Sequence, residues 1–288
     1  MSTEGRSTRC SVCTEVEIGA AWPVRGFSYR RCSACGSAQL DPLPGISAAE
    51  YYDDDYFVGN RVGGYDDYEA DAVNHRRNGR SRLDRIAGCL PSGQIRLIDV
   101  GCAAGYVLEE ARGRGWTASG VDISAWGRRM SASKQFDTFA TFEEAIVTDR
   151  PNVVTLYQVL EHMPDAMQQL DVICSALPAQ GILAIETWDI SSLCARLFGT
   201  HWQQVSPPSV IFLFSRIGLT RSLQRRGMEV LSIRSTSKRV SLQLVLGVIG
   251  QRFAPVERLC RRFARSPMGQ IGMMYRLGDL ITVVARKK

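Results

Sequence analysis

Four cysteines near the start of the chain have the spacing of a metal site. Cys10 and Cys13 form one Cys-x-x-Cys pair, and Cys32 and Cys35 form a second pair. Two such pairs let two tight turns present four thiolates tetrahedrally to one zinc ion. Because protein then fills all four positions, we expect a structural zinc site that supplies folding energy to a short segment. Redox or incidental thiols are the alternative interpretation.

A second chemical signal follows an apolar segment at residues 96–100. This segment contains Asp99, and a turn with Gly101 and Gly105 leads into a helix-like stretch at 106–112. Glycines in such a turn let the backbone pass close to a bound ligand, and the helix beyond presents free N–H groups. Dinucleotide-binding folds use the same device, but their Gly-x-Gly-x-x-Gly order is absent here.

Further polar residues stand at the ends of the next predicted strands. The strand at 117–121 ends in Asp122, at a distance from the first strand that suits a hydrogen bond to ribose hydroxyls. The strand at 137–140 ends at Thr141 and Phe142, where an apolar contact can hold an adenine. A fourth strand at 152–157 runs into the sequence Gln-Val-Leu-Glu-His-Met-Pro-Asp.

This ordered series resembles the class I S-adenosylmethionine (SAM)-dependent methyltransferases. Residues 97–105 (Leu-Ile-Asp-Val-Gly-Cys-Ala-Ala-Gly) match their first motif, 121–124 the second, and 159–165 the motif after the fourth strand. One departure is Ala103, where the family often has glycine. The resemblance implies a Rossmann-like α/β fold with a seven-stranded sheet, SAM as cofactor, and direct SN2 transfer of its methyl group. The predicted SAM contacts are Asp99, Gly101, Ala103, Gly105, Asp122, Ile123, Thr141, Phe142, Tyr157 and Gln158.

An aromatic and acidic segment lies between the cysteines and the first strand of this fold. With the cysteine pairs and a proline-rich turn, the Tyr-Tyr-Asp-Asp-Asp-Tyr-Phe run at 51–57 resembles bacterial methyltransferases that modify glycans and natural-product intermediates. The resemblance implies that this segment covers the cofactor, so Tyr51, Tyr52 and Tyr56 are candidates to contact SAM or substrate. Alternatively, the aromatic residues only dock a linker onto the core.

Only three histidines are available as a general base. Alignment of the reacting atoms supplies much of the rate of methyl transfer, and a base matters when the acceptor is a hydroxyl. His162, after the fourth strand, is the first candidate as base or substrate-orienting group, and His201 is the second. The alternative for His162 is that the Glu-His pair caps the following helix and holds the loop. His75 is expected on a surface helix.

The rest of the chain completes the predicted sheet. A fifth strand covers 181–186, Ser215 caps a helix that ends before Gly227, and two further strands cover 229–236 and 279–285. Trp188 and Trp202 can wall an acceptor pocket, with Glu186 or Asp189 orienting hydroxyls. The predicted organisation is a zinc segment (1–45), a cofactor-covering segment (46–95), the SAM-binding core (96–240), a basic helical insertion (241–278) and the last strand with a basic tail (279–288).

The insertion has the pattern of a basic amphipathic helix. Its apolar positions follow helical spacing and arginines occupy the other faces. The apolar residues are Val256, Leu259, Cys260 and Phe263, and the basic ones are Arg258, Arg261, Arg262 and Arg265. Three roles are open: a lid packed by its apolar stripe, contact with an anionic membrane surface, or a grip on substrate or nucleic-acid phosphates.

Composition and termini bound the class of protein. The start of the chain has no apolar signal region, the apolar run at 240–250 is too short to span a bilayer, and nine cysteines form an odd set. We therefore predict a cytoplasmic SAM-dependent methyltransferase whose acceptor is a hydroxyl of a small-molecule or glycan-type compound. The alternatives are an RNA methyltransferase that uses the zinc segment and the basic C-terminal half, and a non-catalytic scaffold. Signatures of single-strand RNA recognition are absent, so nucleic acid is not expected as a partner.

Overall fold

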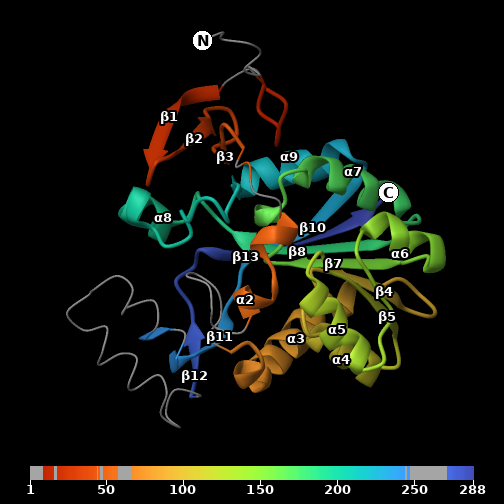
Figure 1. The fold of residues 1–288 in the computed structure, drawn as a ribbon. Coiled ribbons are helices and arrows are strands. Elements are labelled where there is room, and N and C mark those ends of the chain that lie inside the picture. The colour runs from red at the N-terminus through yellow and green to blue at the C-terminus, as the bar shows by residue number, and fades with distance from the viewer. Residues whose placement is uncertain are drawn as a thin grey trace.

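A seven-stranded sheet forms the centre of the molecule, with strand order β10-β13-β8-β7-β4-β5-β6 (Figure 1). The computed structural model describes residues 9–15, 18–43, 45, 48–57, 67–243, 245–246 and 271–288. The strands are β4 (Arg96–Val100), β5 (Thr117–Val121), β6 (Thr138–Phe139), β7 (Val153–Tyr157), β8 (Ile182–Trp188), β10 (Met228–Ser235) and β13 (Leu280–Lys287). The first five are parallel, and β13 runs antiparallel between β8 and β10. The predicted Rossmann-like, seven-stranded fold is confirmed.

Helices cover both faces of this sheet (Figure 1). One face carries α3 (Ala72–Ile86), α4 (Tyr106–Gly113) and α5 (Ala125–Ser133), and the other carries α6 (Phe142–Thr148), α7 (Ala166–Ala176) and α9 (Arg216–Arg225). Hydroxyl side chains begin several of them, because a serine or threonine oxygen accepts an N–H that the first turn leaves free. Ser215 accepts the Gly218 N–H at the start of α9, as the sequence predicted. Helix α8 (Leu193–Phe198) and the short 3-10 helix Gly199–His201 lie outside these layers.

The central strands are buried on both faces. Every residue of β7 and of β8 is buried, as is typical of parallel strands between two helical layers. Alternate side chains enter two core clusters: Leu156 and Ile185 face one helical layer, whereas Tyr157 and Ala184 face the other. Because these strands are parallel, the carboxyl ends of β4, β5, β7 and β8 lie at one edge of the sheet, where ligands bind in open α/β sheets.

The N-terminal cysteine segment is joined to the core by a shared sheet. Its strands β1 (Ile18–Val24), β2 (Phe27–Cys32) and β3 (Ala38–Leu40) are antiparallel. A short strand of the core, β9 (Phe212–Leu213), extends that sheet by pairing with β3. We call residues 9–43 of this sheet and its turns the N-terminal module; its β-strands lie above the end of the main sheet in Figure 1.

Between β10 and β13 the described residues form a second small sheet. Strand β11 (Lys238–Ser241) pairs antiparallel with β12 (Gly272–Tyr275), so the predicted insertion is bounded by a strand pair. The predicted basic amphipathic helix, residues 256–265, lies outside the described residues. In the part of the chain that the structure describes, we find no helix with the length and apolar character needed to cross a membrane.

Two short helices, α1 (Ala48–Tyr51) and α2 (Asp54–Phe57), carry the aromatic segment. Three 3-10 helices complete the described elements: η1 (Glu69–Asp71), η2 (Ala87–Cys89) and η3 (Leu160–His162).

Candidate functional site

The turn after β4 has backbone conformations that few residues adopt. Gly101 and Gly105 have φ angles of +76° and +75°, and Ala103 between them also lies in the left-handed region at +45°. That region costs an L-residue energy, which is why glycine is favoured there. A Cβ at Gly101 would stand 2.1 Å from a methyl group of Val159, so only glycine fits. The predicted glycine turn is therefore tightly constrained, and Ala103 bears part of the strain.

Asp122 holds this turn in place from the end of β5. One carboxylate oxygen accepts the Ala103 N–H at 2.7 Å, and the other accepts the Ser124 N–H at 2.8 Å. Burial raises the pKa of Asp122, and these two N–H groups oppose that rise. Ile123 beside it is 47% exposed, an apolar surface open to a ligand. The structure thus brings the predicted ribose-binding acid against the predicted glycine turn.

Asp99 lies buried at the end of β4. Its side chain is 3% exposed and accepts a hydrogen bond from the Thr155 hydroxyl at 2.5 Å. Burial raises the pKa of Asp99 to about 7, because a carboxylate loses hydration inside the protein. Its predicted contact with SAM stays a prediction.

Replacing Asp99 by asparagine should stabilise the ligand-free protein at pH 8, by on the order of 2 kcal/mol. The folded-state pKa of about 7 lies above the ordinary value of 3.8. Below about pH 4 the carboxyl is protonated in both the folded and the unfolded protein and does not affect the free energy of unfolding. As the pH rises toward 7, ionisation of the carboxyl destabilises the folded protein progressively more. Above pH 7 this destabilisation stays at its full value. Denaturant unfolding of both proteins at pH 5 and pH 8 measures this. An advantage of Asp99→Asn that is equal at the two pH values would contradict the prediction.

The end of β7 carries a second strained residue. Gln158 has a φ of +62°, and its side-chain oxygen accepts hydrogen bonds from Lys238 Nζ at 3.0 Å and Arg82 Nη2 at 3.4 Å. Strained backbone of this kind concentrates at functional sites. The neighbouring Tyr157 ring lies 4.8 Å from the Arg82 guanidinium, and its buried hydroxyl has no hydrogen-bond partner among the described residues.

A buried charge cluster beside Gln158 was not predicted. Arg82 Nε donates to Glu186 Oε1 at 2.9 Å, and Arg85 lies 3.6 Å from the other oxygen of the same carboxylate. Burial lowers the pKa of Lys238 to about 8. The signal in the sequence was the i, i+3 spacing of the two arginines, which places both on one face of α3. Glu186 is thus engaged by arginines, which corrects its expected role in orienting an acceptor hydroxyl.

Trp202, a predicted pocket wall, and Asp189, predicted to orient hydroxyls, both have partners within the fold. Trp202 is 2% exposed and donates its indole N–H to Asp279 at 2.8 Å. Asp189 is 1% exposed and accepts hydrogen bonds from the Ser191 N–H at 2.8 Å and Arg216 Nε at 2.7 Å. These two residues therefore hold the loops after β8, and the expectation that they face an acceptor is corrected.

Thr141 and Phe142 begin helix α6. The Thr141 hydroxyl accepts the Glu144 N–H at 3.2 Å, and the Phe142 ring is 2% exposed in the core. Both residues thus have structural partners, and their predicted adenine contact stays a prediction.

His162 is oriented by a backbone carbonyl. Its Nδ1 lies 2.6 Å from the Ser209 carbonyl oxygen. A carbonyl only accepts, so Nδ1 carries the proton, and Nε2 keeps a lone pair that can take a proton from a substrate. Asp165, the N-cap residue of helix α7, makes no side-chain cap, and no hydrogen bond among the described residues shows the Glu-His pair capping that helix. The pair does hold the loop, as the alternative also expected, because the Glu161 carboxylate accepts the Thr187 hydroxyl at 2.9 Å and His162 bonds to the Ser209 carbonyl.

The other two histidines have different surroundings. His201 is exposed in the 3-10 helix after α8, and its Nδ1 lies 3.4 Å from the hydroxyl of its neighbour Thr200. It remains the second candidate base. His75 lies in helix α3, whose outer face is exposed, as expected of a surface helix. Its ring stacks 4.1 Å from Tyr68 and 5.4 Å from Tyr106, and burial lowers its pKa to about 3.

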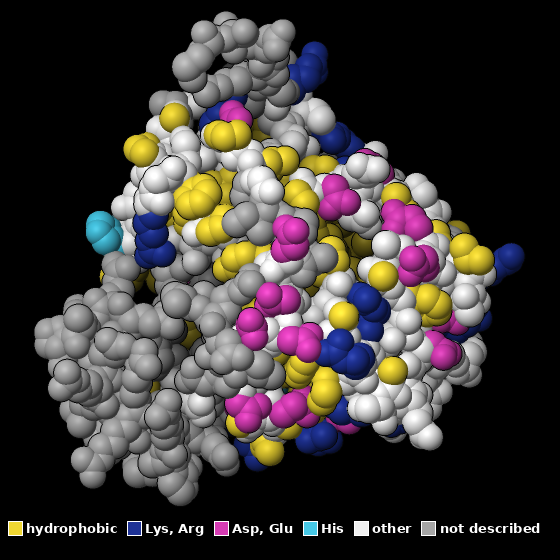
Figure 2. All heavy atoms as spheres, in the orientation of Figure 1, with side chains coloured by type: hydrophobic (Ala, Val, Ile, Leu, Met, Phe, Trp, Pro, Cys, Tyr) yellow, Lys and Arg dark blue, Asp and Glu magenta, His cyan; other side chains and the backbone are white. Residues whose placement is uncertain are grey.

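The aromatic segment at 51–57 connects the glycine turn with His162. Phe57 stacks on Trp126 at 4.3 Å in a cluster that includes Ala104 of the turn, and Tyr56 packs against that cluster. Tyr52 lies edge-on to Tyr56 at 4.9 Å and to His162 at 5.8 Å between ring centroids. On this face of the molecule, apolar side chains gather in the middle and are flanked by Asp and Glu side chains (Figure 2). The aromatic residues predicted to cover the cofactor thus adjoin both parts of the site.

The four N-terminal cysteines converge on one point. Their Sγ atoms all lie within 4.8 Å of one another, and all four side chains are buried. A hydrogen bond from Cys10 lowers the pKa of Cys35 to about 5, while the same contact and burial raise the pKa of Cys10. Four converging, buried cysteine sulfurs form a donor set that fits zinc.

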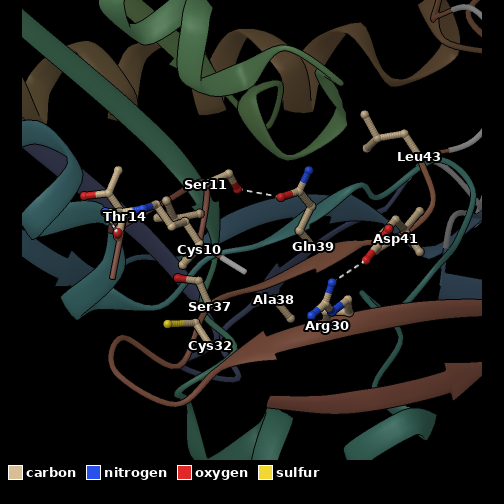
Figure 3. A pocket seen from close by; sticks show the side chains of 13 residues that line it. Cys10, Ser11, Thr14, Arg30, Cys32, Ser37, Ala38, Gln39, Asp41 and Leu43 are labelled. Atoms are coloured by element: carbon tan, nitrogen blue, oxygen red, sulfur yellow. Dashed lines mark hydrogen bonds and ion pairs between the residues drawn. The ribbon is translucent and has the colours of Figure 1, made fainter. Parts of the chain in front are cut away.

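A cavity of about 360 Å³ lies beside the cysteines (Figure 3). Its walls include two side-chain contacts that the figure marks, Ser11 with Gln39 at 2.5 Å and Arg30 with Asp41 at 2.9 Å. None of the predicted SAM contacts lines it. The cavity therefore belongs to the N-terminal module and is separate from the candidate site.

Known proteins similar to this chain share its core. A family described as a methyltransferase domain matches residues 73–233. The ubiquinone biosynthesis O-methyltransferase of Alkalilimnicola ehrlichii is 26% identical over 185 residues, which cover 56% of this chain and 74% of that protein. The protein of the same name from Nitrosomonas europaea is 34% identical over 92 residues, so this chain spans 38% of its length.

Solved structures agree at the level of the fold. A SAM-dependent methyltransferase from Archaeoglobus fulgidus matches with a TM-score of 0.51 and 18% identity, covering 74% of this chain and 94% of that one. The YcgJ protein from Bacillus subtilis matches with a TM-score of 0.53 and 13% identity, covering 74% and 99%.

Proposed function

Because this chain belongs to the methyltransferase domain family, and so carries a SAM-dependent methyltransferase domain, we propose that it methylates a hydroxyl group of a small-molecule or glycan-type acceptor. The observation that carries the proposal is His162, whose Nδ1–H is held by the Ser209 carbonyl and whose Nε2 is left as a base. An amine acceptor needs no such base, whereas a hydroxyl does. The names of the sequence relatives, which are O-methyltransferases, favour the same acceptor atom.

The residues around the glycine turn fit SAM. The Asp122 carboxylate has the position and chemistry to accept ribose hydroxyls, and the exposed Ile123 side chain offers an apolar surface for the adenine. The left-handed backbone of the turn and the strained Gln158 complete the proposed cradle. When bound, SAM supplies a methyl group already activated on a sulfonium, so the protein need only orient and deprotonate the acceptor.

His162 then acts on the acceptor in one proton transfer. The Nε2 lone pair would accept the proton of the acceptor hydroxyl, and the Ser209 carbonyl would stabilise the resulting imidazolium through Nδ1–H. Tyr52 lies edge-on to the imidazole and packs against one side of the proposed base.

The proposal is tested by calorimetry followed by product analysis. We expect SAM and its demethylated product to bind at about one site per chain. Transfer from SAM labelled with carbon-13 in its methyl group to phenolic and sugar hydroxyl acceptors should then give an O-methyl resonance by NMR. A label that appears on nitrogen or carbon would overturn the proposed acceptor, and absence of binding would favour the non-catalytic scaffold.

We also propose that the four-cysteine cluster holds one structural zinc ion. Metal analysis should find about one zinc per chain, and Cys13→Ser should lose it. The melting temperature of that variant should fall by about 5 °C or more, because a loss of roughly 2 kcal/mol shifts a protein of this size by that amount. Cys89→Ser is the matched control, since Cys89 is a free cysteine outside the cluster. Unchanged zinc content in Cys13→Ser would contradict the site.

A further inference from the structure

Three consecutive peptide groups, at residues 209–211, lie between the N-terminal module and His162. The Ser209 carbonyl accepts the His162 Nδ1–H at 2.6 Å. The Val210 carbonyl accepts the phenol of Tyr29, on β2 of the module, at 2.5 Å. Residues 209–211 therefore contact both the proposed base, His162, and the N-terminal module.

The next residue strengthens the same connection. The Ile211 N–H donates to the Glu161 carbonyl at 2.8 Å, one residue before His162. The Ile211 carbonyl accepts the Leu40 N–H of β3 at 2.9 Å, and β3 continues its pairing onto β9. The module and the 3-10 helix that carries His162 are thus bonded to the same peptide groups.

The segment is held within its own loop as well as from outside it. Its Val210 N–H and Ser209 hydroxyl donate to the Ser206 carbonyl at 3.0 and 2.9 Å, and its regular strand pairing begins at β9. Tyr29 is 0% exposed, and burial raises the pKa of its phenol, which keeps the hydroxyl protonated as a donor. A buried hydroxyl that lost its acceptor would cost free energy, so the bond between Tyr29 and Val210 resists displacement.

We propose that Tyr29 of the N-terminal module is a positioning residue for His162, and that the module serves to hold the Ser209 carbonyl where it fixes the imidazole with its proton on Nδ1. The relevance to catalysis rests on the proposed role of His162 as the base. The physical connection does not, because it is visible in the protein without acceptor or SAM. By this inference the N-terminal module supports the proposed base, through Tyr29 and through the pairing of β3 with β9.

Nitrogen-15 NMR of the histidine rings in the zinc-loaded, full-length protein tests the connection directly. With three histidines in the chain, each ring can be assigned by its own His→Gln variant. In Tyr29→Phe, which removes one hydroxyl and keeps the ring, the His162 signals should shift toward the tautomer protonated on Nε2. The His75 and His201 signals should stay in place.

The matched control is Arg30→Gln on the neighbouring residue of the same strand. Arg30 pairs with Asp41 at 2.9 Å within the module, so its loss should leave the His162 tautomer unchanged. A His162 spectrum that Tyr29→Phe does not move, or that Arg30→Gln moves equally, would overturn the inference. Removal of zinc by a chelator provides a second perturbation that needs no substitution, and it should shift the same His162 signals.

Kinetics separate this inference from the proposed function. With a hydroxyl acceptor, Tyr29→Phe should lower kcat about tenfold while SAM affinity is unchanged, as expected for a misoriented base. If His162→Gln retains full turnover, the proposed base is wrong, yet the NMR result still decides whether Tyr29 positions the ring. If Tyr29→Phe does not shift the His162 signals and His162→Gln is inactive, His162 remains the proposed base and Tyr29 is not a positioning residue.

Discussion

Replacement of Asp122 by asparagine is expected to weaken SAM binding roughly 100-fold, because charged hydrogen bonds are worth about 1.5–3 kcal/mol each. Both carboxylate oxygens accept backbone N–H groups, from Ala103 at 2.7 Å and Ser124 at 2.8 Å. An amide turns one of these acceptors into an N–H₂ that faces another N–H. The variant therefore loses the proposed bonds to ribose and also loosens the turn that lies against the cofactor.

Isothermal titration with SAM measures this loss. Asp137→Asn is the matched control, since Asp137 precedes the next strand and its side chain is exposed. The control should bind SAM as the unmodified protein does. Equal affinities of Asp122→Asn and Asp137→Asn would remove Asp122 from the cofactor site.

Replacement of His162 by glutamine is expected to lower kcat by about 10²- to 10⁴-fold with a hydroxyl acceptor, the range that a general base contributes. Glutamine can still hydrogen-bond to the Ser209 carbonyl, but it cannot take up a proton at neutral pH. SAM affinity should stay the same, because the base acts on the acceptor side.

The comparison with His201→Gln decides between the two candidate bases. His201 is exposed, so its substitution should leave both turnover and SAM binding near normal. Loss of turnover in His201→Gln alone would transfer the base role to His201. Normal turnover in both variants would mean that the reaction needs no histidine base.

Local sequence patterns predicted the architecture and its cofactor motifs well. The strand at 117–121, the cap at Ser215 and the helix after Gly105 occur where the sequence placed them, because buried apolar runs, hydroxyl caps and left-handed glycines act over a few residues. The resemblance to SAM-dependent methyltransferases is confirmed by the family match over residues 73–233. The cysteine pairs also converge as their spacing predicted.

Other features depend on contacts between distant parts of the chain. Glu186 stood in the sequence as a candidate for orienting an acceptor, yet helix α3 brings Arg82 against it from 104 residues away. The sequence placed His75 only on a surface helix, whereas the structure shows its ring stacked with those of Tyr68 and Tyr106. The residue pattern within one segment cannot predict such contacts, because the partners lie far apart in the sequence.

The sequence by itself therefore determined the class of fold, the glycine turn, the acids at the strand ends and the four-cysteine cluster. Only the tertiary structure decided which charged groups are paired and which nitrogen of His162 is free to act, because both depend on partners supplied by other elements. It alone also placed Tyr29 against the carbonyl next to Ser209, across 181 residues of chain. Residue spacing and composition report on local structure, whereas these contacts form only when the fold brings distant elements together.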